Sequence, residues 1–239
     1  MIMLKRNRSR WAAMCGVLVV LLLPVVATVM PAPAWAADFA AQQQVVDKAK
    51  LTLEAFAADP SLKEPLHEWG PQARALFIVP QFIRGAFIFG GAGGSGVLLV
   101  RDDKTGKWGQ PVFYNIGSAS FGLQIGGDVS EIVLVVRTTK GLEEFYRSDF
   151  KLGGNAGMAV GPVGSGASVH GITADIVAYA RKKGAFAGIA LEGAVVTVSD
   201  DSNAAYYGRA VRPVDIITKG DVANPKSLAL REAATTLMK

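Results

Sequence analysis

The stretch of sequence that decides the fold is residues 84–101, which read RGAFIFGGAGGSGVLLVR. Its glycines, from Gly91 to Gly96, match the G-x-G-x-x-G spacing of dinucleotide-binding loops. That fingerprint requires a helix directly after the glycines, whereas the apolar residues 97–100 begin and end with valine and lack a helix cap. We therefore interpret the stretch as a glycine-rich hairpin in a sheet.

Further β-prone runs, separated by glycine, follow this stretch along the chain. Phe121, Leu123 and Ile125 alternate with small or polar residues, as in a half-buried strand, and the continuously apolar residues 132–136 indicate a strand covered on both faces. Many glycines inside strands predict an antiparallel sheet that curls strongly, towards a barrel or a sandwich. The predicted strands are residues 75–79, 86–89, 97–101, 112–116, 119–125, 131–138, 158–160, 172–180 and 186–198.

Helices are predicted on both sides of this sheet region. Residues 38–59 have apolar side chains at helical spacing, and Pro60 ends this helix. Ser61 and Glu64 have the spacing of a capping box, which predicts a second helix. A short helix is expected near residues 142–147, and a C-terminal helix over residues 227–238. We therefore expect one α+β domain over residues 37–239.

The first 36 residues are typical of a secretory signal peptide. Four basic residues precede an apolar run over residues 12–26, and Ala34-Trp35-Ala36 has the small-x-small form of a cleavage site. We expect cleavage near Ala36 and a periplasmic or secreted protein. Cleavage removes the only cysteine and lowers the net charge from +5 to about +1, so we expect no nucleic-acid partner.

The remaining chain offers little for catalysis. It has no cysteine nucleophile, no G-x-S-x-G motif, and only two histidines, His67 and His170, far apart in sequence. Two histidines without thiols are too few for a zinc site. We therefore expect no enzyme activity, no metal and no cofactor.

Glycine and aromatic residues recur in blocks along the chain, at residues 75–80, 84–88, 90–101, 108–113, 121–126, 151–153, 159–164, 184–188 and 206–208. The order of these blocks resembles that of the SYLF domain family. The resemblance implies a noncatalytic domain that binds anionic phospholipid through basic residues and an N-terminal amphipathic helix. Because the signal peptide directs the chain away from the cytosol, we expect actin not to be a partner.

The resulting hypothesis is a phospholipid-binding domain of the cell envelope. The apolar face of the first helix would enter the headgroup boundary through Val46, Leu53 and Phe56. Headgroup contacts would come from Lys48, Lys50, Arg84 and Arg101. The alternative is an envelope protein–protein interaction module in which this helix face is buried in the domain's own core.

Overall fold

The computed structural model describes residues 34–239 except 87–88, 122–125, 163, 165–168 and 183–190. Residues 33–239 form one compact unit. Apart from residues 34–36, which open the first helix, the predicted signal peptide lies outside the described residues. Among the described helices, none combines the length and the apolar character needed to cross a membrane.

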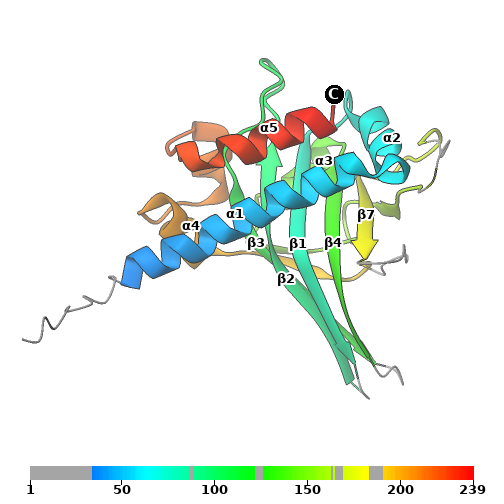
Figure 1. The fold of residues 1–239 in the computed structure, drawn as a ribbon, viewed down its shortest axis with the longest axis horizontal. Coiled ribbons are helices and arrows are strands. Elements are labelled where there is room, and N and C mark those ends of the chain that lie inside the picture. The colour runs from blue at the N-terminus through cyan, green and yellow to red at the C-terminus, as the bar shows by residue number, and fades with distance from the viewer. Residues whose placement is uncertain (1–33, 87–88, 122–125, 163, 165–168, 183–190) are drawn as a thin grey trace, which may run out of the picture. The chain divides into compact units, whose positions relative to one another are not determined.

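Two helices come first in the described chain, then two groups of four strands separated by a short helix, and last the C-terminal helices (Figure 1). The strands are β1 (Ala75–Ala86), β2 (Phe89–Val100), β3 (Val112–Phe121), β4 (Gly126–Val136), β5 (Asp149–Lys151), β6 (Met158–Val160), β7 (Ile176–Lys182) and β8 (Val195–Val198). The helices are α1 (Ala34–Ala58), α2 (Pro60–Trp69), α3 (Thr139–Glu144), α4 (Asp200–Tyr207) and α5 (Leu228–Leu237). A π-helical turn at Asp215–Lys219 and a 3-10 turn at Pro225–Ser227 precede α5.

All eight described strands form one strongly curled sheet in the order β5-β8-β3-β2-β1-β4-β7-β6. Every pairing is antiparallel except that of β6 with β7. The predicted α+β class, the curled sheet and the helices at both ends are therefore confirmed. The long strands β1 to β4 occupy the middle of the sheet, with β1 between β2 and β4.

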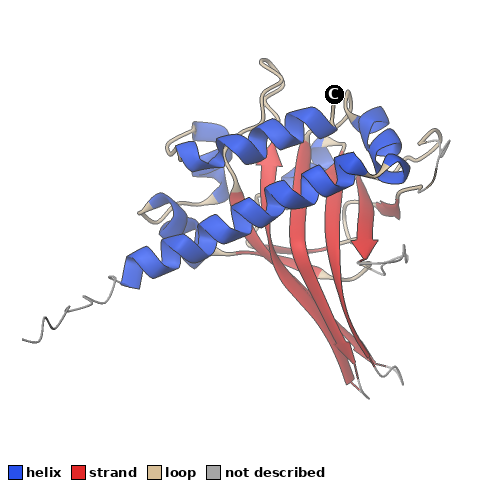
Figure 2. Ribbon diagram, viewed as in Figure 1, coloured by secondary structure: helices blue, strands red, loops and turns tan. Residues whose placement is uncertain are grey.

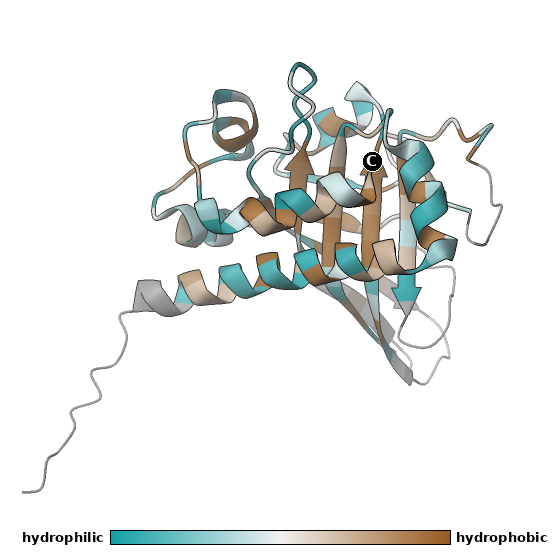
Figure 3. Ribbon diagram, turned by 45° about the horizontal axis from the view of Figure 1, so that its top comes forward, coloured by the Kyte–Doolittle hydropathy of each residue, from teal (hydrophilic) through white to brown (hydrophobic). Residues whose placement is uncertain are grey.

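The part of the sheet that includes residues 75–79 of β1 and the strand segments beside them is covered on both faces. On one face α1, α2 and α5 pack on alternate residues of the central strands, among them Ile78, Val97 and Val133. On the other face Phe77, Tyr114 and further aromatic side chains pack together. Figure 3 shows the hydrophobic strand segments that lie beneath α1 and α5. Residues 132–136 are fully buried, as their continuous apolar run predicts.

A β-bulge in β1 explains the glycines that follow it. The pairing of β1 with β2 passes from Ile78–Val97 to Ile83–Gly93, so β1 has one extra residue around Pro80 and Gln81. A Cβ atom on Gly94 would lie 2.2 Å from the Gln81 carbonyl oxygen. The predicted glycine hairpin is therefore wrong: these glycines lie inside β2, where Gly94 makes room for the bulged strand.

Beyond the bulge the four central strands continue past the helices as a projection (Figures 1 and 2). We call this projection the distal sheet; it comprises residues 83–86 of β1, 89–93 of β2, 117–121 of β3 and 126–129 of β4. Past Gly117 on β3 and past Ser130 on β4, its two outer edges have no strand partner among the described residues, because β8 pairs with residues 114–117 of β3 and β7 with residues 130–136 of β4. No described helix lies over the far ends of these strands (Figures 1 and 2).

Several local predictions need correction. Asp59, not Ser61, caps α2: its carboxylate accepts a hydrogen bond from the Ser61 amide at 3.0 Å, because Pro60 takes the first helical position. The strand expected over residues 172–180 begins only at Ile176. The helix α4 and the strand β5 were not expected. Leu123, Ile125 and residues 186–190 of the predicted strands lie outside the described residues.

The bulge makes a testable prediction about two glycines of β2. We expect Gly94→Ala to lower the free energy of unfolding by about 2–3 kcal/mol, because the new methyl group must displace backbone. Gly91→Ala is the matched control, since its Cβ would meet only the Ser118 carbonyl oxygen at 3.9 Å. Urea denaturation of both variants measures the difference, and equal stabilities would contradict the role given to the bulge.

Two leucines of α1 make a second prediction. Leu53 is fully buried whereas Leu51 is 58% exposed. Leu53→Ala should lower the free energy of unfolding by about 3 kcal/mol through lost burial and a cavity, and Leu51→Ala by less than about 0.5 kcal/mol. Thermal melts monitored by circular dichroism test this; a small effect at Leu53 would mean that α1 is not part of the core.

Candidate functional site

The apolar face of α1 is not available to a membrane in this structure. Val46, Leu53 and Phe56 are at most 1% exposed and belong to the core between α1 and the sheet. Their predicted role in insertion is therefore corrected: the helix is amphipathic because one side faces the sheet. The burial agrees with the arrangement considered as the alternative, in which this face lies in the domain's own core.

The two lysines of α1 have different surroundings. Lys48 donates a hydrogen bond from Nζ to Gln81 Oε1 at 2.9 Å, which joins the helix to the bulge of β1. Lys50 forms an ion pair with Glu54 at 2.7 Å, one turn later on the same helix. Lys48 therefore lies beside the distal sheet without a carboxylate partner among the described residues, whereas the charge of Lys50 is neutralised locally.

The two predicted arginines do not come together. Arg84 lies in the distal sheet, opposite Asp128 of β4. Arg101 follows the last residue of β2, at the other end of the sheet, and its amide donates to the Arg74 carbonyl oxygen at 2.7 Å. Nine residues of β1 separate Arg74 from Arg84, so the two ends are about 30 Å apart. One headgroup cannot contact both Arg84 and Arg101.

The structure instead brings together three exposed apolar side chains at the distal sheet. Leu51 on α1, Ile83 on β1 and Val129 on β4 are 58%, 57% and 45% exposed. Ile83 and Val129 are register partners across β1 and β4. Only six large apolar residues are exposed among those that the structure describes, and half of them are here. We call these three residues the distal apolar surface.

Polar and charged groups border the distal apolar surface. Leu51 and Val129 line a cavity of about 330 Å³ together with Lys48, Glu131 and Arg181. Arg181 donates from Nε to Glu131 Oε2 at 2.8 Å, and Thr52 donates to the other oxygen of the same carboxylate at 3.4 Å. Two cations against one carboxylate leave this border with a net positive charge.

Among the residues whose side chains the structure describes, the same face of the distal sheet is otherwise lined by very small residues. Counting by twos from the helix-covered residues of each strand, these residues are Ile83 and Val129 among glycines and one alanine. Internal packing does not require all these glycines: a Cβ on Gly85 would meet no atom within 4 Å, and one on Gly117 only the Ala92 carbonyl oxygen at 3.7 Å. Glycine inside a strand lowers the stability of the fold. At Gly85 and Gly117 no contact within the described domain requires it.

The headgroup contacts predicted from the sequence include Lys48 and Arg84 but not the exposed apolar residues beside them. Ile83 and Val129 both lie outside the predicted strands. Only the pairing of β1 with β4 makes them neighbours. The signal available in the sequence was the absence of charge: residues 85–100 and 112–127 contain no Asp, Glu, Lys or Arg. Such runs are unusual in strands that project away from the core.

The titratable groups show no catalytic arrangement around this surface. Both histidines, His67 and His170, are exposed. Burial raises the pKa of Tyr179 to about 12, so it stays neutral while its hydroxyl accepts a hydrogen bond from Trp69 Nε1. Among the described residues, no group of three or more His, Cys, Asp or Glu side chains could hold a metal ion.

Known proteins resemble this chain over more than half its length. A family model, Ysc84, described as "Las17-binding protein actin regulator", matches residues 117–237. The SH3 domain-containing YSC84-like protein 1 of Rattus norvegicus is 34% identical over 158 residues, which cover 64% of this chain and 46% of that protein. LAS seventeen-binding protein 3 of Saccharomyces cerevisiae is 32% identical over 144 residues, which cover 57% and 31%. This chain thus spans less than half the length of these relatives.

These relatives correct one expectation from the sequence. The prediction that actin is not a partner is contradicted, because the matched family is described as an actin regulator and the yeast relative is named for binding LAS seventeen. The match itself covers half of the chain, from the second half of β3 through β4 and all later elements. The chain therefore belongs to the Ysc84 family, the SYLF domain family that its glycine-rich blocks resemble.

Proposed function

We propose that this domain is a noncatalytic phospholipid-binding module whose distal sheet contacts the lipid surface. The observation that carries the proposal is the distal apolar surface: Leu51, Ile83 and Val129 are exposed together, next to Lys48. The proposed lipid contact therefore differs from the one predicted from the sequence: it uses the outer side of α1 and the projecting strands in place of the buried face of α1. The predicted export signal would place this contact at the cell envelope.

The balance of apolar and basic groups suits a shallow, reversible contact. Covering the exposed parts of three such side chains is worth about 3 kcal/mol, and a lysine beside an anionic surface adds about 1 kcal/mol. A total of about 4 kcal/mol corresponds to millimolar affinity for these contacts alone. The uncharged ends of the strands add further area, so the attachment is that of a peripheral protein.

The charge distribution of the distal sheet supports the same orientation. Its strand segments have only Arg84 and Asp128 as charged residues, and these face each other across β1 and β4. They lie on the face opposite Ile83 and Val129, since neighbouring residues of a strand point to opposite faces. An uncharged, glycine-lined face lets lipid approach the backbone closely.

The family description favours a second candidate function, a contact with actin-regulating proteins. The matched family is described as an actin regulator, and the distal sheet is uncovered on this face. The two candidates differ in their target, since one surface would bind vesicles and the other a protein. Co-sedimentation with filamentous actin tests the second candidate directly.

Vesicle flotation of residues 33–239 tests the lipid contact. We expect Val129→Asp to reduce the vesicle-bound fraction at least about tenfold, because a carboxylate cannot enter an apolar lipid region cheaply. Val160→Asp is the matched control: Val160 is also an exposed strand valine, 56% exposed, but it lies in β6, outside this surface. Equal binding by the two variants would remove the distal apolar surface from the proposal.

The basic border makes a separate prediction about lipid charge. Lys48→Glu should lower binding to vesicles containing phosphatidylglycerol several-fold and leave binding to phosphatidylcholine vesicles unchanged, since it reverses one charge beside the surface. Lys63→Glu, on the exposed side of α2, makes the same charge change elsewhere. Raising the salt concentration to about 0.5 M should abolish the difference between wild type and Lys48→Glu. A loss that persists at high salt would show that Lys48 acts through folding.

A further inference from the structure

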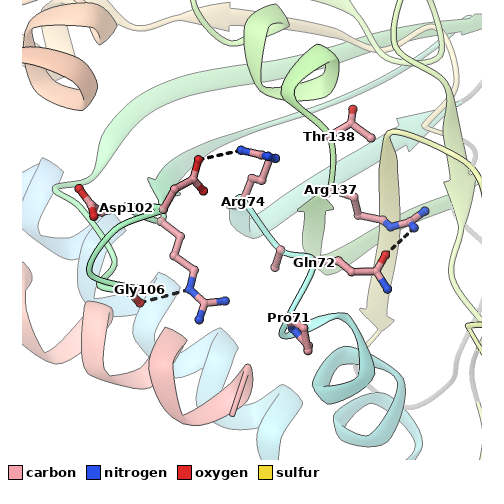
Figure 4. Close-up of a pocket in the computed structure, with 10 residues that line it drawn as sticks. Pro71, Gln72, Arg74, Asp102, Gly106, Arg137 and Thr138 are labelled. Carbon is pink, nitrogen blue, oxygen red and sulfur yellow. Dashed lines mark hydrogen bonds and ion pairs between the residues drawn. The ribbon is translucent and has the colours of Figure 1, made fainter.

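A second cavity lies at the end of the sheet opposite the distal sheet. It has a volume of about 430 Å³, and Figure 4 shows the side chains around it. Three arginines, Arg74, Arg101 and Arg137, line it. The other lining residues are Pro71, Gln72, Ala73, Asp102, Asp103, Gly106 and Thr138.

The order of the strands brings the three arginines together. Arg74 directly precedes β1, whereas Arg101 and Arg137 directly follow β2 and β4. Because β1 lies between β2 and β4 and is antiparallel to both, its beginning and their ends meet at one edge of the sheet. Backbone hydrogen bonds join the three positions: the Arg74 amide donates to Val136, and the Arg101 amide donates to Arg74.

Two of the guanidinium groups are held by backbone carbonyl groups. Arg101 donates from Nη1 to the Gly70 carbonyl oxygen at 2.7 Å and from Nε to that of Gly106 at 3.2 Å. Arg137 donates from Nη1 to the carbonyl oxygens of Ile172 and Ala174, at 2.7 and 2.9 Å, and from Nη2 to Gln72 Oε1 at 2.7 Å. It also lies 4.1 Å from the centre of the Trp69 ring. These guanidinium groups are therefore positioned before any ligand arrives.

The arginines retain donors that no described residue uses. Arg137 Nε is buried and has no hydrogen-bond partner in the structure. Arg101 uses Nε and Nη1, and Arg74 uses only Nη1, so each keeps at least one nitrogen for a ligand among the described contacts.

The two carboxylates of the cavity do not compensate this charge fully. Asp102 accepts hydrogen bonds from the Thr105 and Lys104 amides and the Thr105 hydroxyl, which lower its pKa and turn it towards its own loop. Asp103 accepts a hydrogen bond from Arg74 Nη1 at 2.9 Å, but its side chain is 72% exposed. Three guanidinium groups against two carboxylates leave a net charge of +1, and Asp103 is free to leave Arg74.

We propose that this cavity binds a phosphate group carried by a soluble phosphate ester, which displaces Asp103 from Arg74. Guanidinium groups match phosphate oxygens with paired N–H donors. Arg74 and Arg101 keep unused donors at the cavity, and Arg137, whose terminal nitrogens are occupied, adds positive charge. The cavity exceeds the size of a phosphate ion and leaves room for the remainder of a small ester. The proposal goes beyond the lipid contact, because the distal sheet lies about 30 Å away along β1.

Isothermal titration calorimetry of the full chain with glycerol 3-phosphate tests the proposal. We expect saturable binding that Arg74→Gln weakens at least about tenfold, since Arg74 has no backbone anchor that its loss would disturb. Arg84→Gln is the matched control: it removes the same group near the far end of β1, the strand that follows Arg74, and should leave the affinity unchanged. No saturable heat up to about 10 mM glycerol 3-phosphate, or equal losses in both variants, would overturn the proposal.

Asp103→Asn separates phosphate binding from a structural role of Arg74. Removing the competing carboxylate should tighten glycerol 3-phosphate binding several-fold, whereas a purely structural ion pair would leave the affinity unchanged or lower it. The Asp103 side chain is exposed, so Asp103→Asn should leave the fold intact. This test therefore remains valid even if Arg74→Gln does not fold. Unchanged or weaker binding by Asp103→Asn would overturn the displacement of Asp103.

Vesicles containing phosphatidylglycerol distinguish the two sources of phosphate. If a soluble ester is the ligand, Arg74→Gln should float with these vesicles as wild type does, and glycerol 3-phosphate should not compete with flotation. Loss of flotation by Arg74→Gln, without binding of glycerol 3-phosphate to wild type, would assign the cavity to a lipid headgroup and overturn the soluble ligand. Because Val129→Asp reports on the distal sheet alone, failure of one proposal leaves the other testable.

Discussion

The bulge in β1 is the constraint on which the rest of the structure depends. The extra residue at Pro80 and Gln81 brings the Gln81 carbonyl group against β2, where only glycine at position 94 leaves room for it. The covered half of the sheet lies before the bulge, beneath α1, α2 and α5, and the distal sheet begins directly after it. Lys48 joins the helix layer to this point through Gln81. The boundary between core and projection thus coincides with one irregularity of one strand.

The strand β1 also links the two candidate functional regions. Its first residues follow Arg74 and the arginine cavity, and its last residues, from Ile83 onwards, belong to the distal sheet. Both regions draw their groups from β1 and its two neighbours, because antiparallel strands bring residues that are distant in sequence to one edge. A lipid surface at one end and a phosphate ester at the other would allow one rigid domain to hold two ligands far apart.

The fold could be predicted further than the sites. Periodicity gave the first helix, the central strands and the C-terminal helix, because α1 and α5 show an apolar stripe and residues 132–136 are apolar throughout. The sequence predicts a turn at these glycines because glycine is common in turns. In the structure Gly94 is required because the Gln81 carbonyl group of the neighbouring strand leaves no room for a Cβ atom. Nothing in the local sequence relates Arg137 to Arg74 and Arg101. The three residues come together only because β1 pairs with both β2 and β4.

What the sequence by itself determined is the α+β class, the curled glycine-rich sheet and the family, since these follow from local periodicity and from blocks of residues in a fixed order. Only the tertiary structure decided what the apolar face of α1 contacts. Val46, Leu53 and Phe56 have the pattern of a membrane-inserting helix and of a helix packed on a sheet, because both bury one stripe. The same holds for Lys48, Arg84 and Arg101, whose distances depend on strand pairing rather than on spacing along the chain. Helical and strand periods are local properties, whereas a site requires side chains to meet across strands, which only packing settles.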